Sequence, residues 1–314
     1  MTKLIHVAAA AIFNPEGQVL LALRSKQQHQ GGLWEFPGGK VEANESVLEA
    51  LSRELDEELD IQIDHAATRP LIQVPYHYPD KSVLLDVYKV SGFSGVPHGA
   101  EGQPLEWVDI ANLEQYDFPA ANTPIVNALL LPQCIAITGN ANGTAEYVKK
   151  SVAAISGGAQ WLMLRAHQLS SSERTALARQ IRATIDAADG VVLSLNGSVA
   201  EANDCGVNAL HLSSDKLMVL NTRTEFRGRW LSASCHTIEQ LEKAVSLGLD
   251  FVTLSPVKTT ATHPEQPAMG WQAFSELVNA YPLPVYALGG MTAEDVDQSC
   301  QSGGQGICAI REYW

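Results

Sequence analysis

The sequence predicts an α/β protein with two parts, an N-terminal α/β/α sandwich built around a mixed sheet and a C-terminal (β/α)8 barrel. Its 314 residues exceed the usual size of a single domain. Up to about residue 130, strand-like runs surround one strongly helical segment, whereas beyond it short apolar runs alternate with helical stretches. We therefore expect one domain over residues 1–130 and a second over residues 134–314.

The first part is expected to contain four main strands and one long helix. Apolar runs predict strands over residues 5–13, 19–24, 82–90 and 105–110, and the first of them ends at an Asn-Pro-Glu-Gly turn. Residues 46–59 carry the apolar spacing of a helix. Mixed strands with one or two helices are typical of an α+β sandwich.

The second part contains eight short apolar runs that predict the strands of a barrel. They lie at residues 134–139, 161–166, 191–196, 209–214, 230–235, 251–256, 285–290 and 306–310. Several end in Gly, Ser, Asn or Thr, which is typical where the active-site loops of a barrel begin. Residues 311–314 alone follow the last run, so we expect a barrel that lacks its last helix, with either the first domain or a partner subunit covering that flank.

Composition restricts the partners and the compartment. With 35 acidic and 21 basic residues, the formal net charge of −14 repels the backbone of duplex nucleic acid, so no direct duplex binding is expected. Five cysteines without CxxC pairing favour reduced thiols in a cytoplasmic protein. The first residues lack the pattern of a signal peptide, and no apolar run is long enough for a membrane span. The sequence leaves open whether the protein forms a homo-oligomer.

The strongest chemical signal is a cluster of carboxylates on the predicted helix. Glu54, Glu57 and Glu58 stand at positions i, i+3 and i+4, so a helix places all three on one face. Such a concentration of hard oxygen ligands is what Mg²⁺ or Mn²⁺ requires. Arg53 is placed to orient one of these carboxylates. A solvated acidic face is the alternative for an isolated ExxEE motif.

The segment 39–61 resembles the Nudix box, in which Gly, five residues, Glu, seven residues and Arg-Glu-apolar-x-Glu-Glu are fixed. The matching residues are Gly39, Glu45, Arg53, Glu54, Leu55, Glu57, Glu58 and Ile61, whereas Asp60 stands where the family usually has glycine. The resemblance implies a metal-dependent pyrophosphohydrolase with a nucleotide substrate. It implies Mg²⁺ (or Mn²⁺) ligands at Glu54, Glu57, Glu58 and the Gly39 carbonyl. Either one of these glutamates or Glu45 would deprotonate the attacking water.

Three further segments, residues 33–42, 76–88 and 101–126, resemble the MutT type of Nudix hydrolase. The resemblance implies hydrolysis of the triphosphate 8-oxo-dGTP to 8-oxo-dGMP and pyrophosphate, which sanitises the nucleotide pool. It implies an additional metal-site glutamate at Glu101, pairing of Asn122 with the oxidised base and a place near the base for Arg24. Phe36 and Tyr78 offer flat surfaces for stacking on a purine. Lys81 stands where the relative has arginine.

Each of these residues also has a plainer interpretation. Phe36 would serve equally as a core residue, Asn122 as the cap of a helix beginning near residue 123, and Arg24 as a surface residue. The rival to the favoured substrate is another nucleotide or a thiamine-related diphosphate.

Residues 134–310 resemble the thiamine phosphate synthase/TenI family of barrels. The resemblance implies a thiazole or thiamine phosphate ligand. Its phosphate would lie at Gly289 and Gly290 and at the loop containing Ser255 and Thr259, with Arg165 matching a substrate-binding arginine.

The barrel sequence also departs from the synthase pattern. The lysine expected after the second strand is His167, the metal aspartate after the third is Gly197, and only a shifted Asp215 follows the fourth. These changes predict loss of most metal-dependent synthase activity. Three alternatives stay open, namely a degenerate synthase, a thiazole tautomerase using His236 as acid and base, and a phosphate-sensing module that regulates the hydrolase.

Overall fold

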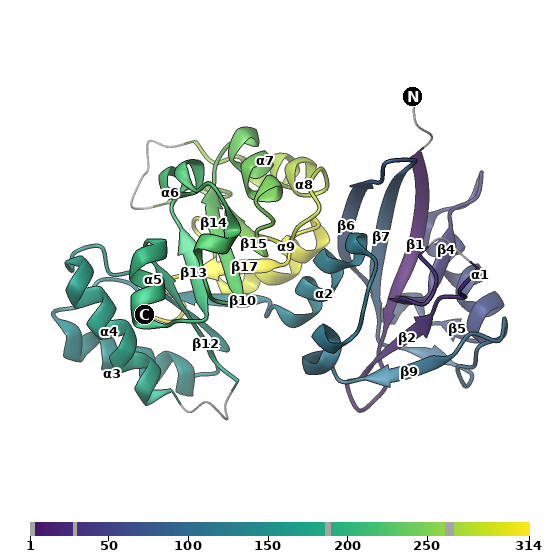
Figure 1. The fold of residues 1–314 in the computed structure, drawn as a ribbon, viewed down its shortest axis with the longest axis horizontal. Helices are drawn as coiled ribbons and strands as arrows, with labels where there is room; N and C mark the ends of the chain where they lie inside the picture. The colour runs from purple at the N-terminus through teal and green to yellow at the C-terminus, as the bar shows by residue number, and fades with distance from the viewer. Residues whose placement is uncertain (1–3, 28–29, 186–189, 261–266) are drawn as a thin grey trace. The chain divides into compact units, whose positions relative to one another are not determined.

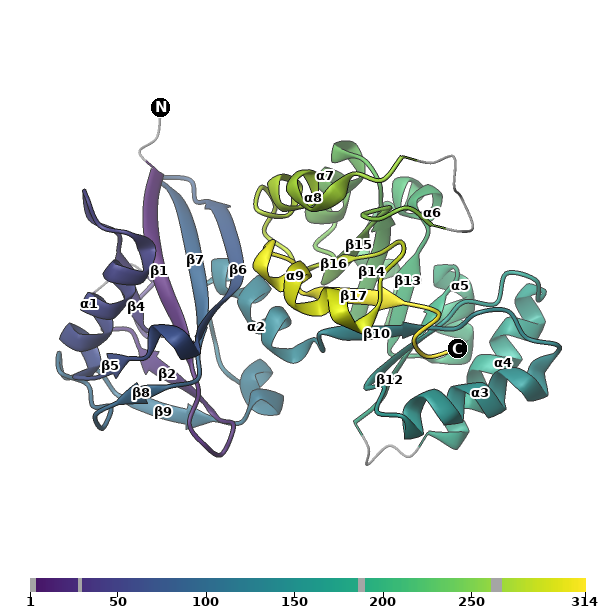
Figure 2. The same ribbon diagram turned by 180° about the vertical axis from the view of Figure 1, so that it is seen from behind.

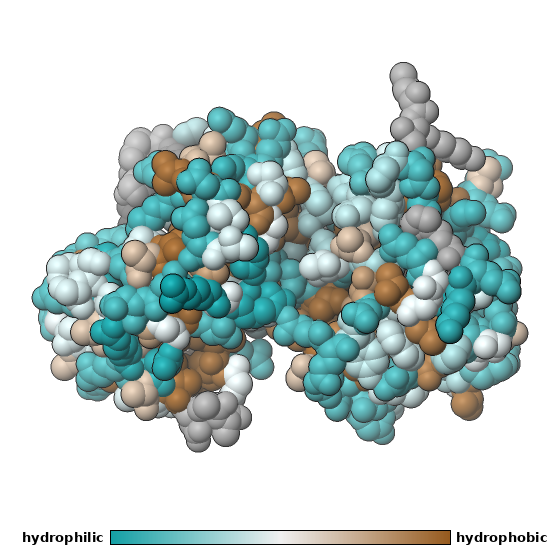
Figure 3. All heavy atoms as spheres, in the orientation of Figure 1, coloured by the Kyte–Doolittle hydropathy of each residue, from teal (hydrophilic) through white to brown (hydrophobic). Residues whose placement is uncertain are grey.

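A computed structural model describes residues 4–27, 30–185, 190–260 and 267–314. The chain divides into two compact units, one of Met1–Leu131 with Asn279–Pro282 and one of Pro132–Val278 with Leu283–Trp314 (Figures 1 and 2). Among the described residues, none of the helices has the length and apolar character needed to cross a membrane. On the face drawn in Figure 3, polar residues cover most of the surface and hydrophobic ones form small groups.

The first unit is built on a four-stranded mixed sheet in the order β4-β1-β7-β6. Its strands are β1 (Leu4–Ile12), β4 (Gly38–Lys40), β6 (Thr68–His77) and β7 (Ser82–Val90). β1 runs parallel to β7 and antiparallel to β4. A second sheet contains β2 (Val19–Leu23), β3 (Trp34–Glu35) and β9 (Leu105–Val108), and a short pair contains β5 (Gln62–Ile63) and β8 (Phe93–Ser94).

Two helices cover opposite faces of the main sheet, α1 (Val47–Leu59) and α2 (Thr123–Leu130). The run of alanines in β1 packs against both helices, because successive side chains of a strand point to opposite faces of the sheet. Ala8 and Ala10 belong to the core cluster of α1, whereas Ala9 and Ala11 belong to the cluster that contains α2. The predicted α/β/α sandwich is therefore confirmed.

Each of the four predicted strands of this unit is present, but β6 was not foreseen. Pro70 and Pro75 lie within β6, and proline argues against a strand in the middle of a sheet. The strand is nevertheless compatible with proline, because β6 lies at the sheet edge and its pairing with β7 shifts register between Pro70 and Ile72. Three 3₁₀ turns, His65–Ala67, Ile110–Gln115 and Ala120–Asn122, connect the remaining elements.

The second unit is a closed barrel of parallel strands in sequence order, and all eight predicted strands are confirmed. They are β10 (Cys134–Ile137), β11 (Trp161–Leu164), β12 (Val192–Asn196), β13 (Ala209–Leu212), β14 (Trp230–Cys235), β15 (Phe251–Leu254), β16 (Val285–Ala287) and β17 (Gly306–Ala309). The surrounding helices are α3 (Thr144–Ser156), α4 (Ser171–Thr184), α5 (Val199–Cys205), α6 (Ser214–Val219), α7 (Ile238–Ser246), α8 (Gly270–Val278) and α9 (Val296–Gln301). 3₁₀ turns also occur at Arg223–Glu225 and Ala293–Asp295.

The segment after β17 forms a turn. Its Trp314 packs against Tyr147 of α3 with ring centroids 5.5 Å apart, and Trp314 Nε1 donates to the Asn140 carbonyl at 3.0 Å. A Cβ at Gly139 would overlap the indole. Trp314 therefore packs beside the loop that follows β10.

Candidate active site

Helix α1 fixes the orientation of the predicted carboxylates. Ser46 caps its first turn in a reciprocal capping box with Glu49, which determines where the helix begins. Leu51, Leu55 and Leu59 are fully buried against the sheet. Because these leucines fix the rotation of the helix, Glu54, Glu57 and Glu58 are directed away from the core.

The glycine pair of β4 brings the backbone up to this helix. Gly39 pairs with Ala8 and Gly38 with Ala9 in the antiparallel ladder between β4 and β1. A Cβ at Gly39 would overlap the Glu54 carboxylate, and a Cβ at Gly38 would overlap the Ala8 carbonyl. Both glycines are therefore needed sterically where the strand passes the carboxylate helix.

Arg53 gathers three of the glutamates. Its guanidinium donates to Glu45 through Nη2 (2.8 Å) and Nε (3.2 Å) and to Glu54 through Nη1 (3.0 Å). Glu57, with a side chain that is 61% exposed, lies 3.4 Å from Nη1. These contacts orient Glu45 and Glu54.

Glu58 lies where burial and neighbouring negative charges disfavour its ionised form. Burial raises its pKa to about 7, a hydrogen bond from the Gly38 N–H opposes the rise, and the charges of Glu35, Glu54 and Glu101 add to it. Glu101 comes from a distant loop, which is anchored because the Ala100 N–H donates to the Glu58 carbonyl at 3.0 Å. The negative charges therefore repel one another at this point.

The donor set fits a hard divalent cation. In the described residues no three acidic, thiol or imidazole groups already form a metal-binding cluster, and Arg53 engages three of the carboxylates. The carboxylates near Glu58 nevertheless repel one another, and Mg²⁺ or Mn²⁺ would offset that repulsion. The Glu54 carboxylate lies directly against Gly39, which brings the backbone of β4 close to the same point. Glu54, Glu57, Glu58, Glu101 and the Gly39 carbonyl, the set predicted from the sequence, are the groups that would hold the cation.

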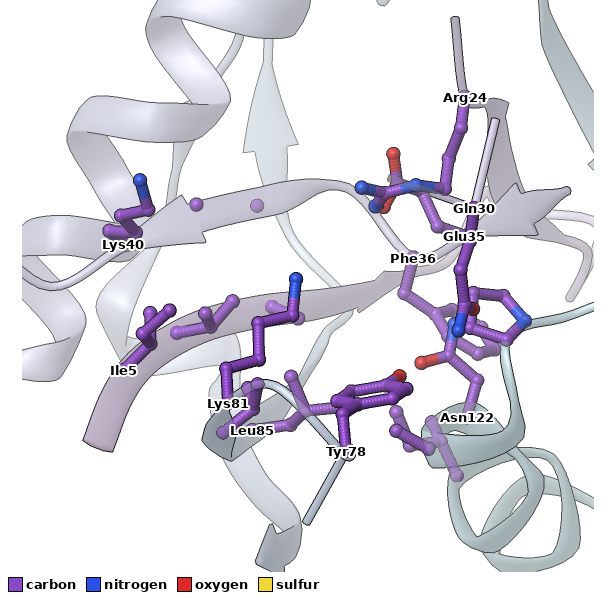
Figure 4. A pocket seen from close by; sticks show the side chains of 18 residues that line it. Ile5, Arg24, Gln30, Glu35, Phe36, Lys40, Tyr78, Lys81, Leu85 and Asn122 are labelled. Carbon is purple, nitrogen blue, oxygen red and sulfur yellow. The ribbon is translucent and has the colours of Figure 1, made fainter. Parts of the chain in front are cut away.

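A cavity of about 240 Å³ adjoins the Gly38-Gly39 strand. Arg24, Gln30, Glu35, Phe36 and Asn122 gather at one end of it, Lys40 and Lys81 lie toward the other, and Tyr78 lies between (Figure 4). All four predicted base-binding residues, Arg24, Phe36, Tyr78 and Asn122, therefore line one cavity.

The structure also tests the plainer interpretations of these residues. Asn122 is 7% exposed and occupies the cap position of α2, yet its side chain makes no capping hydrogen bond. Phe36 is both a core residue and a cavity wall, stacked on Phe118 with centroids 5.6 Å apart and planes 10° apart. Arg24 is half-buried and ion-paired with Glu35. The burial of Glu35 raises its pKa, and the Arg24 charge opposes that rise.

Besides apolar wall residues, three polar or charged residues of the cavity were not predicted from the sequence, namely Gln30, Glu35 and Lys40. Glu35 lies within the segment 33–42, between the aromatic residues Trp34 and Phe36, so a charged side chain at this position was a usable signal. Gln30 lies in a polar loop of ordinary composition, and only the folding of that loop beside Phe36 gives it a place in the cavity.

In the barrel, the structure brings most of the predicted residues together. His236 follows β14, and its Nδ1 lies 2.8 Å from the Ser255 carbonyl at the end of β15. The Lys258 N–H donates to the Gly289 carbonyl at 3.2 Å, and a Cβ at Gly290 would lie 2.7 Å from the Thr259 carbonyl. His236, Ser255, Thr259, Gly289 and Gly290 therefore form one neighbourhood.

Arg165 lies on a different strand of the barrel. It follows β11, where its backbone and the Thr138 hydroxyl exchange hydrogen bonds of 2.8 and 2.9 Å. Its side chain is exposed and, together with Arg174 and Lys216, adds to the effect of burial in lowering the pKa of His167. Among the described residues, no hydrogen bond or ion pair joins Arg165 to the His236 neighbourhood.

The synthase metal does not fit this barrel. Gly197 supplies no carboxylate, Asp215 is exposed within α6, and Lys216 next to it brings a positive charge. The described part of the chain contains no metal-binding cluster of acidic residues here. The charge near His167 is thus positive, the opposite of what a cation requires.

Comparison with known proteins gives each unit a family. Residues 8–128 match the NUDIX domain model, and residues 134–313 match the model described as thiamine monophosphate synthase. The 8-oxo-dGTP diphosphatase of Escherichia coli (strain K12) is 35% identical over 127 residues, 40% of this chain and 97% of that protein. The CTP pyrophosphohydrolase of the same strain is 38% identical over 131 residues, 41% of this chain and 93% of that protein.

For the barrel, the putative thiamine-phosphate synthase 2 of Aquifex aeolicus (strain VF5) is 27% identical over 183 residues, 58% of this chain and 98% of that protein. The chain therefore belongs to the Nudix domain family in its first unit, which makes it a pyrophosphohydrolase, and to the thiamine monophosphate synthase family in its second.

Proposed function

We propose that the first unit hydrolyses 8-oxo-dGTP to 8-oxo-dGMP and pyrophosphate with Mg²⁺ or Mn²⁺. The observation that carries the proposal is the position of Asn122. Its amide is buried in the cavity beside Phe36 without capping α2, so both its acceptor and its donors are available for a purine edge. The cavity also borders Gly38 and Gly39, next to the carboxylates.

In this mechanism the base stacks against Phe36 and Tyr78, and Asn122 determines which base is accepted. The phosphates then extend past Gly39 toward Lys40 and Lys81. When bound, the metal neutralises phosphate oxygens and lowers the pKa of the attacking water. The protein orients the reacting groups through the fixed helix and strand.

The contacts of Glu45 favour a glutamate of α1, rather than Glu45, as the general base. Glu45 was an alternative, but both of its oxygens are engaged. Oε1 accepts from Arg53 at 2.8 Å and from the Glu42 N–H at 2.6 Å, and Oε2 accepts from Arg53 at 3.2 Å. We therefore assign Glu45 to holding Arg53 and leave proton abstraction to a glutamate of α1.

The test is pyrophosphate release with Mg²⁺ from 8-oxo-dGTP, dGTP and CTP at low micromolar concentration. We expect kcat/KM for 8-oxo-dGTP to exceed that for dGTP by roughly 100-fold, about 3 kcal/mol at the transition state. Asn122→Ala is expected to remove most of this preference, whereas the exposed Asn112→Ala serves as the matched control outside the cavity.

A wild-type preference for CTP would overturn the proposed substrate while leaving the hydrolase intact. That outcome is the relevant rival, because a CTP pyrophosphohydrolase is among the similar proteins. Equal rates on all three nucleotides would point instead to a substrate outside this set, and thiamine diphosphate would be the next compound to assay.

For the barrel we infer a second activity, proton transfer on a phosphorylated heterocycle such as a thiazole phosphate. The supporting observation is the hydrogen bond from His236 Nδ1 to the Ser255 carbonyl. A carbonyl only accepts, so Nδ1 carries the proton and Nε2 of the neutral ring is left as the acceptor. His236 can thus take a proton from a bound ligand.

This activity predicts exchange of a ligand carbon-bound proton with solvent deuterium, followed by NMR on thiazole phosphate. His236→Gln should abolish the exchange without changing nucleotide hydrolysis. Exchange that continues at the wild-type rate would exclude His236 as the proton acceptor. Release of thiamine phosphate by a metal-dependent synthase reaction is not proposed, because the carboxylates for that metal are missing.

A further inference from the structure

The loop that carries Glu101 docks on the C-terminal end of helix α1. The last carbonyls of a helix have no partner within it, so they need donors from elsewhere. The His98 N–H donates to the Leu59 carbonyl at 3.2 Å, and the Ala100 N–H donates to the Glu58 carbonyl at 3.0 Å. The loop between β8 and β9 therefore supplies hydrogen-bond donors to the end of the helix.

Gln103 adds its side chain to this contact. Its Nε2 donates to the same Glu58 carbonyl at 2.9 Å, and its Oε1 accepts from the Glu101 N–H at 3.0 Å. One side-chain amide thus bridges the end of the helix and the backbone of Glu101, using its acceptor and a donor at the same time. Neither an ionised carboxylate nor a hydrocarbon chain of the same length can make both hydrogen bonds.

The backbone of the loop leaves room for this amide. A Cβ at Gly99 would overlap the Gln103 carbonyl and would lie 3.0 Å from its Oε1. Gly102 has a φ of 80°, a left-handed value that glycine adopts without strain, and its N–H donates to the Gly99 carbonyl at 2.9 Å. The turn from Gly99 to Gly102 therefore holds Glu101 and Gln103 in a fixed relation.

The bridge ends at the residue where the carboxylates gather. Glu58 is held at its carbonyl by the loop, and its side chain accepts at Oε2 from the Gly38 N–H at 3.2 Å. The negative charge of Glu101 is among those that raise the pKa of Glu58, so the Glu101 side chain lies near that carboxylate. The Gln103 oxygen is engaged by the Glu101 N–H, which suits a residue that orients a metal ligand.

We propose that Gln103 is a positioning residue for the metal site of the first unit, because its amide fixes the loop that carries Glu101 against the end of α1. Without the bridge, the Glu101 carboxylate would have to become ordered when Mg²⁺ or Mn²⁺ binds, and the entropy cost of this ordering would lower the affinity. The inference rests on the proposed metal site and not on the choice of nucleotide.

The test is Mn²⁺ binding to the full chain without nucleotide, followed by the electron paramagnetic resonance signal of free Mn²⁺. Gln103→Met keeps the length of the side chain and removes its polar atoms, and we expect it to weaken Mn²⁺ binding about tenfold. Gln115→Met makes the same change at an exposed position, where the amide donates to the Asn112 side chain at 3.1 Å, and should leave the affinity unchanged. Wild-type affinity in a folded Gln103→Met protein would overturn the proposal.

A double-mutant cycle with Glu101→Gln separates positioning from a general loss of structure. If Gln103 acts through Glu101, Gln103→Met should cost no further Mn²⁺ affinity once the carboxylate has been removed. Additive losses would contradict the proposal, because they would mean damage elsewhere in the site.

If thermal unfolding shows that Gln103→Met is not folded, Gln103→Asn replaces it, since its shorter side chain cannot reach both partners. Wild-type Mn²⁺ affinity in that variant counts against the role of Gln103. A wild-type chain that binds no Mn²⁺ would overturn the metal site and this role with it. A lack of preference for 8-oxo-dGTP, by contrast, would overturn only the proposed substrate.

Discussion

The two units support their candidate sites in different ways. In the Nudix unit, one capped helix carries Glu54, Glu57 and Glu58, and a single glycine strand passes beside it. In the barrel, the residues lie on loops after several strands, with His236 and Gly289 in one neighbourhood and Arg165 elsewhere. Residues that form a site on one helix keep a fixed spacing, so the site can be recognised as a motif in the sequence. A site assembled from several loops can be recognised only from the contacts in the structure.

The units also differ in the charge that they present to a ligand. The Nudix site gathers negative charge around Glu58, which a divalent cation offsets. The barrel has positive charge around His167, from Arg165, Arg174 and Lys216. The same protein therefore combines a site that needs a metal with one that would hold an anion by its own side chains.

Removal of divalent metal should give the largest effect and separate the two sites most clearly. Chelation with EDTA is expected to lower pyrophosphate release by at least about 10³-fold, because the metal stabilises the phosphate charge and activates the water. Binding of thiamine phosphate to the same protein, measured by calorimetry, should be unchanged. A barrel ligand that dissociates on chelation would contradict the assignment of a metal-free site there.

Glu54→Gln should produce the next largest loss, about 10²–10³-fold in kcat/KM for nucleotide hydrolysis. The side chain keeps its size beside Gly39 but loses the charge that would hold the metal. Glu49→Gln in the same helix is the control, since glutamine still completes the capping box of Ser46. Comparable losses in both variants would mean that the helix, rather than the metal site, had been damaged.

A moderate effect is expected for the pH dependence of barrel stability. His211 is buried with its nitrogens 2.9 Å from the Ser232 and Ser234 hydroxyls, and burial lowers its pKa to about 3. The unfolded chain takes up the proton near pH 6.5, whereas the folded chain does not until about pH 3. Stability present above pH 6.5 is therefore lost as the pH falls, by about 1.4 kcal/mol per unit.

The measurement is chemical denaturation of the wild-type protein and His211→Gln between pH 7 and pH 5, followed by the fluorescence of the barrel tryptophans. The difference between the two proteins isolates His211, because all other titrating groups are shared. A difference that stays constant over this range would show that His211 takes up a proton in the folded barrel.

The smallest effect concerns the end of α1. Asp60 adopts φ 56° and ψ 44° as the left-handed cap of this helix, where the family usually has glycine. Asp60→Gly should stabilise the protein by about 0.5–1 kcal/mol, because glycine reaches this conformation without strain. Asp60→Ala should do the opposite, and thermal unfolding of the three proteins checks the order. Hydrolysis should not change, since no predicted ligand is altered.

Much of the fold followed from the pattern of apolar residues. Strand β1 and the eight strands of the barrel were predictable because strands that are buried on both faces read as continuous apolar runs. β6 was not predictable, because Pro70 and Pro75 are acceptable only at a sheet edge and the sequence does not show which strand is the edge.

The sequence by itself determined the carboxylate set, because Glu54, Glu57 and Glu58 are close neighbours on one helix whatever the remaining chain does. Only the tertiary structure decided what surrounds them. The Arg53 contact to Glu45, the approach of Glu101 and the position of Gln30 all depend on loops folding back across the molecule. Contacts between segments distant in sequence leave no periodic signature, so they are visible only once the chain has folded.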